Sequence, residues 1–277
     1  RISTPLSSRP PPPLPPPPPP PAAAAAAGSS TSRPRSWITE RSRWLGTSEV
    51  LASGLPVSGD VRSASAGGKA VTPKDEAESL GIFAALGVPV APHAVIAGAG
   101  DDHGLTYPLA VKALSADLPH KTEAGAVKLG VGSEVELAGA IDEIRANVRK
   151  MKPDLVLDRF LVEEMVKGVG EVLVGFRLDP QVGPVVVLSP GGILAEVYAD
   201  SAIRMAPVTM DDARAMIGEV KGLAPLRGYR NLPKGDLGGL ADAIVKISSL
   251  AEAANPPLDA EINPMIVGGE GKGVFAV

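Results

Sequence analysis

Residues 107 to 130 read Tyr107-Pro-Leu-Ala-Val-Lys-Ala-Leu-Ser-Ala-Asp-Leu-Pro-His-Lys-Thr-Glu-Ala-Gly-Ala-Val-Lys-Leu-Gly130. A short apolar run is followed by a polar loop and a second apolar run, a pattern that predicts a strand, a loop and a strand. Lys112 interrupts the first run, where its charge would be costly to bury without an anion beside it. His120 lies at the tip of the loop.

These two side chains together suggest a chemical role. Imidazole can act as a nucleophile at neutral pH, hold a phosphoryl group on nitrogen and release it again. A buried lysine that attracts an anion and a nearby histidine therefore point to phosphoryl transfer. The alternative is that His120 is a solvated surface residue without a chemical role.

The first 70 residues differ in composition from the rest. Residues 10–21 are almost pure proline and residues 22–27 are pure alanine. Such a segment cannot bury enough apolar surface to offset its ordering entropy, and its prolines favour an extended polyproline helix. We expect residues 1–70 to be a disordered, low-complexity segment. It could be a ligand for proline-recognising domains, an organellar transit peptide, or an artefact of cloning, gene modelling or fusion.

Composition excludes several classes of protein. The chain of 277 residues has no cysteine, so it has no disulfide framework and no thiolate chemistry, which suits a reducing compartment. We expect a cytoplasmic location, with organellar targeting by the N-terminal segment as the alternative. No run of about 18 uncharged apolar residues is present, so no membrane span is expected. The formal net charge of -4 argues against a nucleic-acid partner.

Apolar periodicity and capping residues predict helices interleaved with a mostly antiparallel sheet, an α+β arrangement. We expect the first helix to be capped by Thr72, and we expect a capping box at Ser133–Glu136. The expected helices are 72–86, 133–151, 209 onward and 237–253, and the expected strands are 88–96, 155–166, 171–178, 184–188 and a closing hairpin over 258–277.

Several ordered motifs extend this interpretation. They are His120-Lys-Thr-Glu-Ala-Gly-Ala-Val127, Val162-Glu-Glu-Met-Val166, Gly175-Phe-Arg-Leu-Asp-Pro-Gln-Val-Gly-Pro184, Gly191-Gly192 with Glu196 and Arg204, Leu226-Arg-Gly-Tyr-Arg230, and Glu261-Ile-Asn-Pro264. Together they resemble the nucleotide-binding half of the ADP-forming acyl-CoA (acetyl-CoA) synthetases, an ATP-grasp family related to the succinyl-CoA synthetase beta subunit. The resemblance implies an ATP-grasp domain of two α/β lobes, or subdomains, over residues 71–277.

The same resemblance implies a role for individual residues. Without the resemblance, Glu163 and Glu164 could be an exposed acidic pair, and Gly191 and Gly192 could form an ordinary hairpin turn. By resemblance, the phosphoryl carrier is His120, the phosphate-facing lysine is Lys112, the adenine hinge is Glu163, Glu164, Met165 and Val166, the loop beside the phosphates includes Gly191, Gly192, Glu196 and Arg204, and the Mg²⁺ ligand is Asn263.

The implied cofactors are ATP or ADP and Mg²⁺. Relatives supply a second metal ligand, an aspartate, at the position that would follow Val277, so we expect the metal site to be truncated, with Glu261 as a weak substitute.

The function implied is that of the nucleotide-binding half of an ADP-forming acid-CoA ligase of the acetate-CoA ligase type. It would transfer a phosphoryl group between a histidine and ADP while acyl-CoA, ADP and phosphate interconvert with acid, CoA and ATP. A CoA-binding alpha-type subunit or fused domain would be required. Three alternatives remain: a non-catalytic regulatory module of a protein acetyltransferase, a carboxylate-amine ligase of the wider ATP-grasp class, and an inert gene fragment.

Overall fold

The computed structural model describes residues 61–63, 72–115, 117–118, 121, 124–191 and 200–277. These residues all belong to one compact unit, Leu45–Val277. The proline and alanine runs, His120, Gly192 and Glu196 lie outside the described residues.

The larger of two sheets is built around two long strands, β7 (Gly170–Asp179) and β10 (Pro257–Val267). Within the described residues its seven strands follow the order β2-β1-β10-β7-β8-β9, and β11 pairs with β10 beside this path. Every pairing in it is antiparallel. The remaining strands are β1 (Val61–Ser63), β2 (Thr72–Pro73), β8 (Gly183–Pro190), β9 (Ala202–Met205) and β11 (Val274–Ala276).

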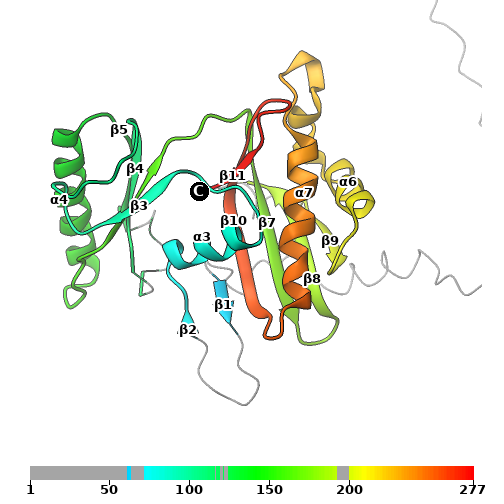
Figure 1. Cartoon of the computed structure of the whole chain (residues 1–277), viewed down its shortest axis with the longest axis horizontal. Helices are drawn as coiled ribbons and strands as arrows, with labels where there is room; N and C mark the ends of the chain where they lie inside the picture. Colours follow the sequence, from blue (N-terminus) through cyan, green and yellow to red (C-terminus); the bar gives the residue numbers. More distant parts are fainter. Residues whose placement is uncertain (1–60, 64–71, 116, 119–120, 122–123, 192–199) are drawn as a thin grey trace, which may run out of the picture. The chain divides into compact units, whose positions relative to one another are not determined.

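Two helices, α6 (Met210–Glu219) and α7 (Leu237–Ser248), lie against this sheet (Figure 1). Apolar residues of α7 at helical spacing, among them Leu240, Ile244 and Ile247, are fully buried against the strands. A third helix, α3 (Glu76–Ala85), adds Leu80 and Phe83 to the same core. Burial of a side chain of this size contributes about 1.5–3 kcal/mol.

The smaller sheet carries both apolar runs of the stretch from residue 107 to residue 130. Its strands follow the order β3-β6-β4-β5 and all pair antiparallel. They are β3 (His93–Ile96), β4 (Leu109–Ala113), β5 (Val127–Val131) and β6 (Phe160–Glu164). Helix α4 (Glu134–Met151) packs on β4 and β5 and buries Leu137, Ile141 and Ile144 in a second core. The expected α+β class is therefore confirmed.

Two predicted helix starts need correction. Thr72 is not the cap of the first helix, because Thr72 and Pro73 pair with β1 as a strand. Asp75 caps α3 instead: its carboxylate accepts from the amide of Glu78, whose carboxylate in turn accepts from the amide of Asp75. At α4, Ser133 is the cap as expected, but the Glu136 carboxylate accepts from the Gly132 amide, so the capping box is only half formed.

Other boundaries shift more modestly. The strands expected at 88–96 and 155–166 are shorter, at 93–96 and 160–164. The short strand Val61–Ser63 pairs with β10 and lies before residue 71, where the two-lobed domain was expected to begin. The closing hairpin is confirmed, and the helix expected from residue 209 is present as α6, with a capping box between Thr209 and Asp212. In the part of the chain that the structure describes, no helix has the length and apolar character to cross a membrane.

Candidate functional site

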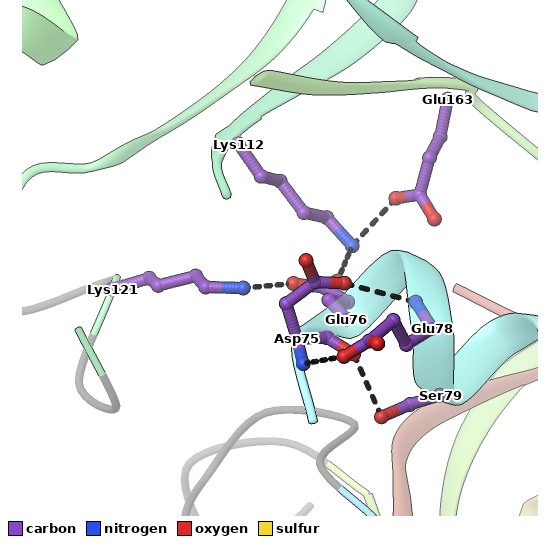
Figure 2. A network of polar contacts seen from close by, with 7 residues as sticks. All are labelled: Asp75, Glu76, Glu78, Ser79, Lys112, Lys121 and Glu163. Atoms are coloured by element: carbon purple, nitrogen blue, oxygen red, sulfur yellow. Dashed lines mark hydrogen bonds and ion pairs between the residues drawn. The ribbon is translucent and has the colours of Figure 1, made fainter. Parts of the chain in front are cut away.

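Three buried charged residues and one partly buried lysine meet between α3 and the smaller sheet (Figure 2). We call Glu76, Lys112, Lys121 and Glu163 the ion cluster. Their side chains are only 3%, 13%, 5% and 2% exposed, respectively. Charged side chains are rarely buried, because an unpaired charge is costly to remove from water. Here two carboxylates face two ammonium groups.

Local structure explains how these side chains converge. Glu76, Leu80 and Phe83 are spaced i, i+4 and i+7 in α3, so Glu76 shares the buried stripe of the helix. In the smaller sheet, Lys112 of β4 lies opposite Leu161 of β6, and Ala110 lies opposite Glu163. Lys112 and Glu163 are therefore diagonal neighbours on one face of the sheet.

The Glu76 carboxylate bridges the two lysines. Its Oε1 accepts from Lys112 Nζ at 2.7 Å, and its Oε2 accepts from Lys121 Nζ. Lys112 Nζ also lies 2.5 Å from Glu163 Oε2. This second contact is an ion pair, so Lys112 lies between two carboxylates.

Both ends of the Glu76–Lys112 pair are held in their charged forms. Burial alone would raise the pKa of Glu76, but the nearby charges of Lys112 and Lys121 and their hydrogen bonds outweigh it, and they lower the pKa from 4.5 to about 2. Burial alone would lower the pKa of Lys112, yet the charges of Glu76 and Glu163 raise it above its ordinary value. Electrostatics within the cluster therefore dominates over burial.

The expected hinge leaves the smaller sheet at the end of β6. The Glu164 carboxylate accepts from the Thr106 amide at 2.8 Å, and the Met165 amide donates to the Pro108 carbonyl at 3.1 Å. Glu163 is not the exposed acid of the alternative interpretation, since its side chain points at Lys112. A hinge role for Glu163, Glu164, Met165 and Val166 stays a prediction.

Gly191 and Arg204 were expected to lie beside the phosphates, and each contacts another part of the protein. Gly191 donates its amide to the Glu171 carbonyl at 3.0 Å, and a Cβ on Gly191 would lie 2.8 Å from the backbone of residues 171 and 172. The Arg204 guanidinium pairs with Glu219 of α6. The structure thus explains Gly191 by a close strand approach and gives Arg204 a structural partner, and contact of either with a phosphate stays a prediction.

Asn263 lies where β10 interrupts its pairing with β7, between Ile262 and Met265. It is half-buried, and Glu261 shares its side of the strand by alternation. Amide and carboxylate oxygens suit Mg²⁺, which keeps several waters and needs few protein ligands. Within the described ranges, no group of three or more His, Cys, Asp or Glu side chains is arranged to hold a metal ion. The donor chemistry at Asn263 fits Mg²⁺, and its role stays a prediction.

Sequence reasoning missed Glu76 and Lys121 as site residues. Glu76 was hidden among the acids of the helix start, although its spacing to Leu80 and Phe83 was a usable signal of burial. Lys121 follows His120 directly, but no pattern in the sequence indicates that its ammonium group turns toward α3. His120 itself lies outside the described residues, so its role stays a prediction.

Comparison with known proteins decides the family. Residues 65–277 match the model of a family described as an ATP-grasp domain. The chain belongs to the ATP-grasp family. The predicted resemblance and fold are confirmed, and the antiparallel sheets with their covering helices are the ATP-grasp architecture of this chain.

Within the family, the similar proteins include two ADP-forming acetate-CoA ligases. The chain is 33% identical over 208 residues to the beta subunit of acetate-CoA ligase [ADP-forming] II of Pyrococcus furiosus, covering 73% of this chain and 88% of that subunit. It is 35% identical over 195 residues to acetate-CoA ligase [ADP-forming] I of Archaeoglobus fulgidus, covering 69% of this chain but only 28% of that protein. The chain thus spans most of the length of the Pyrococcus subunit but only about a quarter of the length of the Archaeoglobus protein.

A solved structure is similar across nearly its whole length. The dinucleotide-forming acetyl-coenzyme A synthetase 1 of Ca. Korarchaeum cryptofilum, in complex with coenzyme A, Ca-AMPCP and HgCl⁺, superposes with a TM-score of 0.68 at 26% identity, covering 85% of this chain and 96% of that one. Another structure of that synthetase, with coenzyme A and Mg-AMPPCP, has its phosphohistidine segment pointing towards the nucleotide-binding site. It covers 72% of this chain and 88% of that one, with a TM-score of 0.61 at 27% identity.

Proposed function

We propose that this chain is the nucleotide-binding half of an ADP-forming acid-CoA ligase and that it transfers a phosphoryl group between His120 and ADP. The observation that carries the proposal is the likeness over 88% of an acetate-CoA ligase beta subunit. A charged lysine at the position that the resemblance assigns to the phosphates also supports it.

Each proposed role follows from side-chain chemistry. The Lys112 ammonium supplies positive charge to the phosphates of the nucleotide and stabilises the charge that spreads over the transferring phosphoryl oxygens. His120 accepts the phosphoryl group on a ring nitrogen, so that one transfer becomes two easier steps. Backbone groups from Glu163 to Val166 hold the adenine.

Mg²⁺ would neutralise charge on the phosphate oxygens. The amide oxygen of Asn263 is the ligand that we assign to it, in keeping with the oxygen preference of this ion. The Korarchaeum synthetase was solved with Mg-AMPPCP, which supports this choice of cation.

The proposal includes a partner. This chain corresponds to the beta subunit of one ligase and to a part of another, longer one. We infer that a CoA-binding alpha-type subunit or fused domain forms the acyl phosphate and exchanges the phosphoryl group with His120. The two lobes would then present the nucleotide to His120.

A labelling experiment tests the phosphoryl carrier. The full chain is incubated with Mg²⁺ and ATP radiolabelled in its γ-phosphate, a half-reaction that needs only groups assigned to this chain. We expect an acid-labile, base-stable label on the protein, as phosphohistidine chemistry requires. His120→Ala should abolish the label and leave ADP binding within about twofold.

His103→Ala is the matched control, because His103 contacts Tyr107 just before β4 and has no assigned role. Its label should equal that of the wild-type chain. A label that persists in the His120 variant, or a wild-type chain that binds ADP but takes up no label, would overturn the carrier role.

A further inference from the structure

The ion cluster contains one carboxylate that holds two lysines. Both oxygens of Glu76 are used, one by Lys112 and the other by Lys121 (Figure 2). The four charges of the cluster sum to zero. A bidentate acid between two ammonium groups has the same donor arrangement that two lysines present to a phosphate.

We propose that the space between Lys112 and Lys121 is an oxyanion site that the chain fills with its own Glu76 carboxylate, and that a phosphate group of the ligand displaces this carboxylate. The inference deepens the proposed function and rests on it, since Lys112 is the lysine assigned there to the phosphates. Glu76 acts as a built-in competitor that keeps the two lysines charged and in place until a phosphate arrives.

The charge arrangement requires such a displacement. Lys112 already faces two carboxylates, at 2.7 Å and 2.5 Å. A phosphate arriving beside Lys112 would meet two negative charges at close range in a buried setting, where repulsion is screened weakly. One carboxylate has to leave before the phosphate can pair with Lys112.

Glu76 is the carboxylate that can be exchanged. Its departure removes a carboxylate partner from both ammonium groups at once, whereas departure of Glu163 would remove a partner from Lys112 alone. Glu163 is also fixed in the interior of a paired strand, while Glu76 is the first residue of α3. The first turn of a helix favours negative charge, so an incoming phosphate gains from the same helix end that now favours Glu76.

Pyrophosphate is the probe, and calorimetric titration of the full chain at constant ionic strength is the measurement. Glu76→Gln removes the competing charge and keeps the shape of the side chain. We expect this variant to bind pyrophosphate at least about tenfold more tightly than the wild-type chain, which corresponds to about 1.4 kcal/mol. The double variant Glu76→Gln/Lys121→Met, which lowers the positive charge again, should return to near the wild-type affinity.

Glu78→Gln is the matched control, because Glu78 lies in the same helical turn, contacts Lys74 rather than the cluster, and keeps its capping role as glutamine. Its affinity should match the wild-type value. Unchanged or weaker binding by folded Glu76→Gln would overturn the proposal and leave Glu76 as a residue that merely holds the lysines in position.

A second measurement covers a variant that folds poorly. Two buried lysines without Glu76 should destabilise the chain, and pyrophosphate should then restore folding by taking its place. We expect pyrophosphate to raise the melting temperature of Glu76→Gln several degrees more than that of Glu76→Asp, which keeps the charge. Equal shifts in both variants contradict the proposal.

Neither measurement involves His120, so the outcomes of the two proposals can be told apart. A chain that fails to take up label but shows this pattern would refute the proposed function and retain the oxyanion site.

Discussion

Glu76 and Lys112 stabilise the fold through their charges as well as through their packing. From the sequence, Glu76 would be a solvated acid at the start of a helix. In the structure its side chain is 3% exposed and both of its carboxylate oxygens are paired. Removing one partner from a buried pair typically costs about 3–5 kcal/mol, because the other charge stays buried without compensation. The cluster therefore links the stability of the chain to pH.

The pKa of Glu76 predicts the direction of this dependence. Its folded value of about 2 lies below its ordinary value of 4.5, so the ionised form stabilises the fold. That contribution is complete above about pH 4.5 and is lost as the pH falls toward about 2. Since a tenfold change in proton affinity corresponds to about 1.36 kcal/mol, the contribution is about 3 kcal/mol.

Chemical denaturation at a series of pH values measures this effect. The difference in unfolding free energy between wild type and Glu76→Gln should be largest at neutral pH and should shrink between about pH 4.5 and 2. Glu78→Gln, with its exposed side chain, should differ little from wild type throughout. A Glu76→Gln difference that stays constant with pH would show that packing, rather than charge, accounts for its effect.

At the same scale, the sequence predicted part of the cluster. An apolar run broken by Lys112 correctly indicated a buried lysine that needs an anion. The identity of that anion could not be predicted, since Glu76 is 36 residues away and Glu163 lies on another strand. Such pairings depend on how elements pack, which local patterns do not encode.

At the scale of elements, periodicity predicted most helices and strands, and tertiary pairing corrected their ends. Thr72 and Pro73 have the residue types of a helix start, but pairing with β1 makes them a strand and moves the cap to Asp75. Strand lengths were overestimated for β3 and β6, because apolar residues continue beyond the paired segments. Capping chemistry alone does not choose among several candidate residues.

Gly191 gives a test at this scale. A methyl group there would lie 2.8 Å from the backbone of β7, and backbone cannot yield as a flexible side chain can. We expect Gly191→Ala to destabilise the chain by about 1–3 kcal/mol in denaturant unfolding.

Gly139→Ala is the comparison, because Gly139 is exposed within α4 and nothing lies within 4 Å of an added Cβ. It should stabilise the chain by about 0.5–1 kcal/mol, since alanine is the better helix former. Equal effects of the two substitutions would contradict the close approach at Gly191.

At the scale of the whole molecule, the ordered motifs between residues 71 and 277 were sufficient to predict the ATP-grasp family, which the match over residues 65–277 confirms. What they could not predict is the ion pair that joins Lys121, the residue after His120, to Glu76 of α3. The nucleotide proposed for this fold would have to engage the same lysines.

Calorimetric titration of the full chain with ADP in the presence of Mg²⁺ tests whether the chain binds a nucleotide at these lysines. We predict saturable binding with one site, and at least a tenfold loss of affinity in Lys112→Met. The matched variant Lys128→Met removes an exposed lysine of the neighbouring strand, which is paired with Glu143, and should bind as the wild-type chain does. Absence of ADP binding by the folded wild-type chain, or equal affinity in the two lysine variants, would contradict the assignment of a nucleotide site at Lys112.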